Sequence, residues 1–126
     1  VTSEVAVRPR PEMAGYVASK AGLEAFAEAM AMECEGTGVR VGIARPGPCS
    51  TEQGSTWAPE AVERIVESWR SWGLMRHGST LLPEQVAGAI VAMVSVPRGA
   101  RWASVEVQPE APVQGDPRER ANPEEP

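Results

Sequence analysis

The chain has 126 residues, of which 42% are hydrophobic, and a formal net charge of −5 at pH 7. That length predicts a single domain with a modest core. The negative charge and the scattered arginines argue against a nucleic-acid or anionic-membrane partner, because both bind concentrated basic surfaces. No apolar run approaches the roughly 20 residues of a transmembrane helix, so we expect a cytoplasmic protein.

Residue types that commonly bind metals are sparse. Cys34 and Cys49 lack metal-ligand spacing, and we expect both to be reduced thiols, with a disulfide between them as the less favoured alternative. Cys34, near a helix end, is predicted to lie in the core. His77 is the only histidine and has no second ligand close in sequence, which favours a solvent-facing loop residue over a metal or catalytic role. We therefore expect no metal site.

The first signals in chain order are a short strand end and a long helix. Residues 1–3 are β-prone and lead into a loop that contains Pro9 and Pro11, so we interpret them as the end of a strand. A helix is predicted from Tyr16 to about Glu35, where glycines follow. Small residues on one face of this helix favour close packing against a sheet or another helix. Its predicted buried stripe is Leu23, Phe26, Ala27 and Met30.

A second strand is predicted for residues 39–44, which are rich in β-branched side chains and precede Pro46 and Gly47. A helix that leads straight into a strand is typical of a β-α-β crossover, so we expect a parallel sheet. Ligands in such sheets bind beyond the carboxyl ends of the strands. Ser3, the start of the helix at Tyr16, and residues 46–51 all fall at that edge.

Beyond Thr51 the pattern is helical and then irregular. Helices are predicted for residues 59–72 and 83–94, and a third strand for residues 102–108, which alternate in polarity. Prolines, glycines and mixed charges predict a disordered tail at residues 113–126. Three tryptophans either line a substrate pocket or form the apolar face of the first of these helices: Trp57, Trp69 and Trp72.

Tyr16 is the only tyrosine in the chain, and Lys20 is the only lysine. Their spacing of four residues places both side chains on one face of a helix. An ammonium near a phenol favours the phenolate, so such a pair is suited to proton exchange near neutral pH. The structural alternative is a tyrosine of an amphipathic helix beside a solvated lysine.

Several residues of the predicted edge together resemble a known family. They are Ser3, Tyr16 thirteen positions later, Lys20, and Pro46-Gly47 with Thr51 four residues after the glycine. This combination resembles the C-terminal half of a short-chain dehydrogenase/reductase, over residues 1 to about 112. It implies an α/β fold, the C-terminal part of a Rossmann-type doubly wound parallel sheet, without the N-terminal dinucleotide-binding half. Residues 52–82 would form the variable lid over the substrate.

The resemblance also implies a role for each residue. Tyr16 is then the general acid/base, and Lys20 binds the nicotinamide ribose and favours the phenolate. Ser3 holds and polarises the substrate oxygen, with its neighbour Thr2 as an alternative source of that hydroxyl. The backbone of Cys49 contacts the carboxamide. The implied cofactor-binding residues are Tyr16, Lys20, Pro46, Gly47, Cys49 and Thr51.

The implied activity is NAD(P)-dependent hydride transfer between a nicotinamide cofactor and an alcohol or carbonyl substrate, with a homo-oligomer as the full-length form. We expect residues 1–126 alone to bind NAD or NADP poorly and to be inactive, because the pyrophosphate-binding turn of the family lies outside them. The alternative is a non-catalytic fragment or interaction module that pairs with intact family members. An epimerase or dehydratase of the extended branch, which shares the Tyr/Lys pair, is less favoured.

Overall fold

The computed structural model describes residues 1–52 and 55–113. Its elements are a short 3-10 helix η1 (Glu4–Ala6), α1 (Ala14–Glu33), β1 (Ile43–Pro46), α2 (Pro59–Ser71), α3 (Pro83–Val94) and β2 (Ser104–Val107). The two strands pair in parallel, from Ile43 opposite Ser104 to Pro46 opposite Val107. The chain is therefore an α/β protein with a two-strand parallel sheet.

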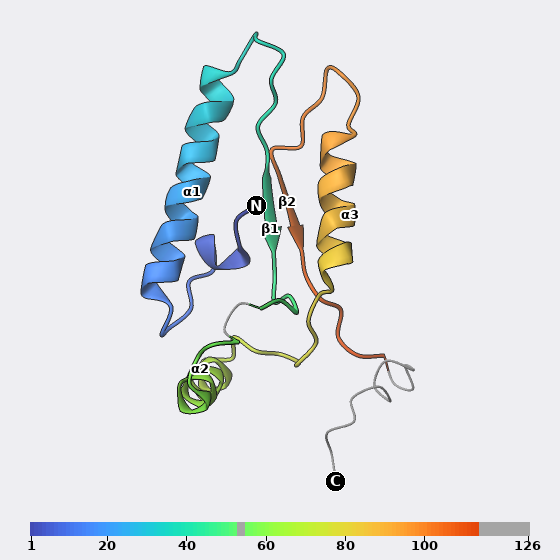
Figure 1. The fold of residues 1–126 in the computed structure, drawn as a ribbon. Helices are drawn as coiled ribbons and strands as arrows, with labels where there is room; N and C mark the ends of the chain where they lie inside the picture. The colour runs from blue at the N-terminus through green and yellow to red at the C-terminus, as the bar shows by residue number, and fades with distance from the viewer. Residues whose placement is uncertain (53–54, 114–126) are drawn as a thin grey trace.

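Figure 1 shows how these elements are arranged around the strands. In that view α1 lies on one side of the strands and α3 on the other. The start of α1 and the carboxyl ends of both strands lie at the same end of the molecule, and α2 lies beyond that end (Figure 1). The predicted edge is thus a real meeting point of separate segments.

The predicted helices and the parallel pairing are confirmed, with small shifts at the ends. Both α2 and α3 begin at a proline, which has a suitable backbone angle and needs no hydrogen-bond acceptor there. The strands differ more from the prediction. β1 covers residues 43–46 instead of 39–44, so most of the predicted strand is not formed as one, and β2 covers residues 104–107 instead of 102–108. The disordered tail predicted for residues 113–126 lies outside the described residues, apart from Val113.

The strand end predicted at residues 1–3 is not formed as a strand. Ser3 is extended, with φ −164° and ψ 154°, and the Thr2 N–H donates to the carbonyl oxygen of Ala44 in β1 at 2.8 Å. This contact places the segment beside β1, although it is a single bond and not a ladder. Regular pairing needs a run of such bonds, so the segment remains irregular.

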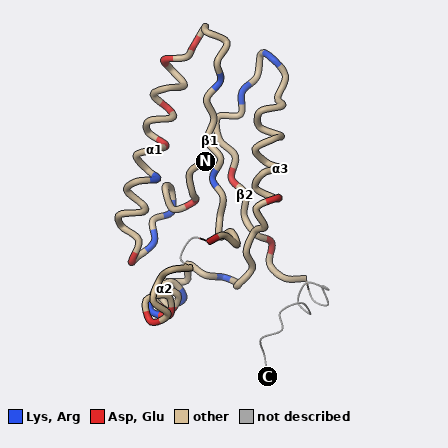
Figure 2. The backbone as a smooth tube through the Cα atoms, in the orientation of Figure 1, with Lys and Arg blue, Asp and Glu red and all other residues tan. Residues whose placement is uncertain are grey.

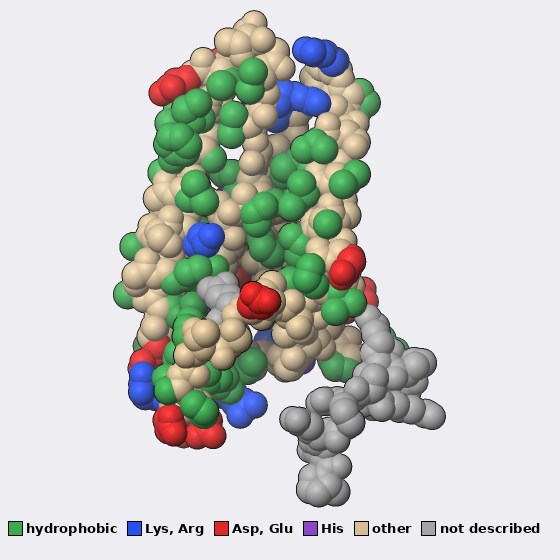
Figure 3. Space-filling view, viewed as in Figure 1, with side chains coloured by type: hydrophobic (Ala, Val, Ile, Leu, Met, Phe, Trp, Pro, Cys, Tyr) green, Lys and Arg blue, Asp and Glu red, His purple; other side chains and the backbone are tan. Residues whose placement is uncertain are grey.

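The buried stripe predicted for α1 is wrong in part, because Ala27 and Met30 are half-buried but Leu23 and Phe26 are exposed. Leu23 is 40% exposed and Phe26 is 62% exposed, whereas Glu24 on another face is only 7% exposed. The more buried face of α1 includes Glu24, Ala27 and Met30, whereas Leu23 and Phe26 point outward. Figure 3 shows hydrophobic side chains gathered on the surface over α1.

Glu24 is buried because it joins α1 to β1 and to the N-terminal segment. Its carboxylate accepts hydrogen bonds from Arg45 Nε and Nη2, both at 2.7 Å, and from Thr2 Oγ1 at 2.7 Å. The Arg45 hydrogen bond lowers the pKa of Glu24 against the opposing effect of burial, with the Thr2 hydroxyl adding to it. The same pair raises the pKa of Arg45. A two-pronged ion pair of this kind fixes helix against strand.

Charged residues are spread over helices, strands and loops, with both signs interspersed along the backbone (Figure 2). The core among the described residues is small and consists of Val5, Ile43, Ala44, Ile65 and Leu81. No helix in the described part of the chain is long and apolar enough to cross a bilayer.

Candidate active site

Tyr16 and Lys20 lie on the first turns of α1, at the end of the molecule where the strands finish. Both side chains are half-buried. The Lys20 ammonium nitrogen is 5.5 Å from the centre of the Tyr16 ring, a distance at which a cation is attracted to an aromatic face. The two groups that the sequence placed on one helix face are therefore close neighbours in space.

Ser3 is 9% exposed and follows the residue that bonds to β1. Its Oγ accepts a hydrogen bond from the Val5 N–H at 3.4 Å, which fixes the hydroxyl at the start of η1. A hydroxyl in that role still has its own hydrogen to donate to a ligand. Thr2, the alternative source of a functional hydroxyl, donates its hydrogen to Glu24, so the geometry favours Ser3.

The loop after β1 is held by hydrogen bonds to residues on both sides of it. The Gly47 N–H donates to the Val107 carbonyl at 2.8 Å. Leu81 then binds two consecutive peptides of the loop, because its N–H donates to the Pro48 carbonyl and its carbonyl accepts from the Ser50 N–H, each at 2.8 Å. Thr51 is exposed at the end of this loop.

In this bridge the N–H and C=O groups of Cys49 point away from Leu81. In a parallel bridge the residue opposite the partner turns its own N–H and C=O to the other side. Within residues 1–52 and 55–113 no hydrogen bond is found for the Cys49 N–H or C=O. A backbone donor and a backbone acceptor are thus side by side at the carboxyl end of β1.

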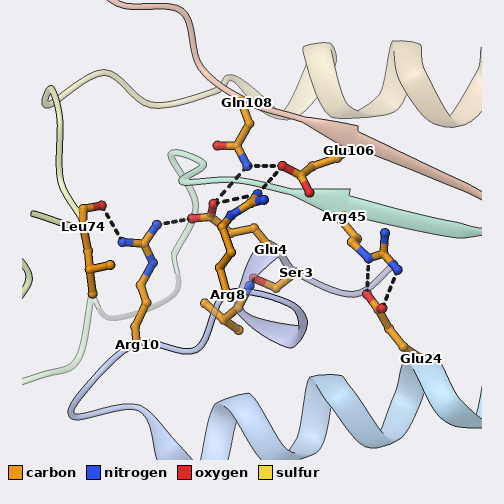
Figure 4. Close-up of polar contacts among 10 residues, drawn as sticks. Ser3, Glu4, Arg8, Arg10, Glu24, Arg45, Leu74, Glu106 and Gln108 are labelled. Carbon is orange, nitrogen blue, oxygen red and sulfur yellow. Dashed lines mark hydrogen bonds and ion pairs between the residues drawn. The ribbon is translucent and has the colours of Figure 1, made fainter.

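A buried carboxylate next to Ser3 was not predicted from the sequence. Glu4 is 4% exposed, and it accepts hydrogen bonds from Arg10 Nη2 at 2.5 Å, Gln108 Nε2 at 2.9 Å and Arg8 Nη2 at 3.4 Å (Figure 4). Gln108 lies 104 positions from Glu4 in the chain, so no local sequence pattern predicts this cluster.

Arg8 links the same cluster to the last strand. It donates to Glu106 as well as to Glu4, and the Glu106 hydrogen bond raises the pKa of Arg8 against burial. Burial raises the pKa of Glu106, but hydrogen bonds from Arg8 and Gln108 outweigh that effect and lower it overall. The loop after Ser3 is in this way bonded to β2.

A cavity of about 560 Å³ opens beside this cluster. Its walls come from the loop after Ser3, the loop after β1, the end of α2 with the residues that follow, and the end of β2. They include Glu4, Arg10, Pro48, Trp69, His77 and Gln108. This volume lies in the range of small-molecule binding sites.

Two predictions about aromatic residues are decided by this cavity. His77 was predicted to face solvent, which is wrong: the residue is half-buried, and its Nδ1 is inaccessible and has no hydrogen-bond partner in the described chain. His77 belongs to the loop after α2, and the residues of this loop line the cavity. Of the tryptophans, Trp69 lines the cavity, whereas Trp57 is 42% and Trp72 is 72% exposed.

Comparisons with known proteins connect this arrangement to a family. The family model described as short chain dehydrogenase matches residues 1–61, which include the Ser3, Tyr16 and Lys20 positions and β1 with its loop. Over these residues the chain is similar to the short-chain dehydrogenases.

Two curated relatives show how much of a dehydrogenase the fragment represents. It is 32% identical over 99 residues to 2,3-dihydro-2,3-dihydroxybenzoate dehydrogenase of Escherichia coli (strain K12), an alignment covering 75% of this chain and 40% of that protein. It is 40% identical over 60 residues to an NADPH-dependent aldehyde reductase-like protein, chloroplastic, of Arabidopsis thaliana, covering 45% of this chain and 22% of that protein. The fragment therefore spans less than half the length of these relatives.

A solved structure shows the same fold. The closed form of serine dehydrogenase complexed with NADP+ superimposes with a TM-score of 0.65 at 21% identity, covering 84% of this chain and 41% of that one. At this identity the likeness shows the fold alone, which is a fragment of a Rossmann-like dehydrogenase fold.

The extent predicted for the family resemblance is wrong. We predicted the C-terminal half of a family member over residues 1 to about 112, but the family model matches residues 1–61, the N-terminal part of this chain. The extension had rested on two amphipathic helices and an alternating strand. Such patterns occur in many folds and carry little family information.

Proposed function

We propose that this chain carries the proton-transfer part of an NAD(P)-dependent oxidoreductase that acts on an alcohol or carbonyl substrate. The observation that supports this most is the convergence at one edge of the sheet. Ser3, the Tyr16–Lys20 pair and the loop at 46–51 come from three segments. Binding beyond the carboxyl ends of parallel strands is the general rule for such sheets.

Each residue then has a distinct part. The Tyr16 phenol gives or takes the proton of the substrate oxygen, as a general acid/base. Lys20, whose ammonium lies beside the Tyr16 ring, binds the ribose hydroxyls of the cofactor. The Ser3 hydroxyl donates to the substrate oxygen and so positions and polarises it.

The family uses NAD or NADP, and the cofactor, when bound, supplies or accepts the hydride. The residues present fit its nicotinamide end. A carboxamide offers one donor pair and one acceptor, which matches the unengaged N–H and C=O of Cys49. Pro46, Gly47 and Thr51 complete the surface around it. A backbone contact of this kind accepts a cysteine side chain at position 49.

The segment of residues 52–82, all of which is described except residues 53 and 54, is proposed as the substrate lid. It contributes Trp69, His77 and the intervening loop to the cavity that Glu4 and Arg10 also line, so its side chains would contact the part of the substrate that does not react. The cytoplasmic location and a homo-oligomeric full-length form remain predictions.

A chimera tests the function. Residues 1–112 replace the aligned part of the Escherichia coli dehydrogenase, and oxidation of its substrate is followed by reduced-cofactor absorbance. We expect activity in the chimera and a loss of about 10²-fold or more with Tyr16→Phe. Trp72→Phe, an exposed aromatic change, is the matched control. An active chimera that tolerates Tyr16→Phe would refute the assignment, and we expect residues 1–126 alone to be inactive.

A second candidate is a non-catalytic fragment that pairs with an intact family member. The specific observation is the outward apolar surface of α1, where Phe26 is 62% and Met32 is 66% exposed. Mixing the chain with the Escherichia coli relative and measuring sedimentation tests it. A complex that Phe26→Ser weakens would support pairing, and independent sedimentation would contradict it.

A further inference from the structure

Arg10 lies where the loop after Ser3 meets the end of α2. Its Nη2 donates to Glu4 Oε1 at 2.5 Å, and its Nη1 donates to the Leu74 carbonyl at 2.7 Å. Its guanidinium carbon is 5.0 Å from the centre of the Trp69 ring. The Arg10 side chain is only 11% exposed, so its contacts with Glu4, Leu74 and Trp69 are largely shielded from solvent.

Trp69 strengthens the junction from the other side. Its indole Nε1–H donates to the carbonyl of Pro11, the residue after Arg10, at 3.0 Å. The Leu74 N–H in turn donates to the Trp69 carbonyl at 2.9 Å. The end of α2 and the residues after it are thus bound to residues 10 and 11 by both side-chain and backbone groups.

The same junction forms one corner of the cavity described above. Glu4 and Arg10 line it from one side, and Trp69 and Leu74 from the other. Figure 4 shows Arg10 reaching from the loop to both Glu4 and Leu74. Because these walls belong to segments far apart in sequence, the cavity keeps its shape only while they are held together.

We propose that Arg10 is a positioning residue that docks residues 69–75 against the residue after Ser3 and thereby shapes the cavity. Its consequence for substrate binding rests on the proposed function, whereas the docking itself does not. Arginine is suited to this place because its planar fork points two N–H groups in different directions and its face stacks on an aromatic ring. Lysine has the same charge but no fork, so it satisfies Glu4 and releases Leu74.

Hydrogen exchange on the full 126-residue chain tests the proposal. Arg10→Lys should raise exchange about tenfold or more at the amides of residues 69–75, while the amides of β2 stay unchanged. The Trp69 indole signal, assigned with Trp69→Phe, should also exchange faster. The matched control is Arg64→Lys, because Arg64 joins α2 to Glu12 at 3.2 Å across an exposed surface and should alter neither region.

Two results would overturn the proposal. If the amides of residues 69–75 exchange at the wild-type rate in Arg10→Lys, a positive charge alone is enough to dock this segment. An equal loss of protection in β2 would assign Arg10 to general stability. Trp69→Leu provides a second variant: its effect should equal that of Arg10→Lys, and the double variant should add little, because both remove the same junction. Fully additive effects would count against a shared junction.

The chimera adds a functional readout that is separate from folding. There Arg10→Lys should raise the substrate KM about tenfold with kcat nearly unchanged, because the reacting groups stay in place. An inactive chimera would contradict the proposed function and leave the exchange result standing. If the chimera is active and Arg10→Lys changes neither kcat nor KM, the docking by Arg10 has no effect on substrate binding and is structural only.

Discussion

The ion pair between Glu24 and Arg45 gives the most direct test of how the fold is held. Glu24→Gln keeps the shape of the side chain and removes its charge. Losing one partner of a buried pair costs about 3–5 kcal/mol, but the Arg45 side chain is 18% exposed and regains some water. The glutamine oxygen still accepts one hydrogen bond, so we expect a loss of about 2 kcal/mol.

Urea unfolding of the 126-residue chain measures this loss. With a slope of about 2 kcal/mol per molar, the unfolding midpoint should fall by about 1 M at pH 7. Glu33→Gln is the matched control, because Glu33 is an exposed residue of the same helix. Its midpoint should stay within error of the wild type.

The direction of the pKa shift of Glu24 also predicts how the stability difference between wild type and Glu24→Gln changes with pH. The pKa of Glu24 is lowered in the folded chain, so its stabilisation is present above the unfolded pKa of about 4.3 and is lost as pH falls through the folded pKa. The gap between wild type and Glu24→Gln should therefore close in acid, where a protonated glutamate resembles glutamine. Equal midpoints at pH 7, or a gap that persists unchanged in acid, would refute the reasoning.

Three further changes are predicted to act locally. Gly42→Ala should destabilise the chain by at least about 1 kcal/mol in urea unfolding, because its Cβ would lie 2.8 Å from the Trp102 carbonyl oxygen. Ile65→Ala should cost about 2 kcal/mol, since Ile65 is 9% exposed, and circular dichroism should show a loss of helix. Glu106→Gln should flatten the acid limb of the stability curve, because the lowered pKa of Glu106 contributes stability above the unfolded pKa of about 4.3, and this stability is lost as pH falls through the folded pKa. An unchanged acid limb would contradict this.

Local spacing predicted the parts of the site that depend on one element. Tyr16 and Lys20 are neighbours because a four-residue spacing on a helix makes them so. The order of helices and strands likewise predicted a parallel sheet and the edge where Ser3 lies. These features follow from periodicity, which is visible in sequence.

Other features depend on partners that sequence does not bring together. Glu24 looks like a surface residue until Thr2 and Arg45, more than twenty positions away, come beside it. Glu4 is a similar case with Gln108. Leu23 and Phe26 were placed inward because hydrophobicity was the only criterion, whereas the bond between Glu24 and Arg45 helps to set which face of α1 meets the strands.

The bond between Glu24 and Arg45 has a consequence for chemistry two turns away. Tyr16, Lys20 and Glu24 follow one another at intervals of four along α1, so clamping Glu24 sets the roll of the helix about its own axis. A helix turns about 100° per residue, and even a modest rotation would swing the phenol away from the sheet edge. In this way Glu24, which has no proposed contact with substrate or cofactor, would set the orientation of the residue that is proposed to transfer the proton.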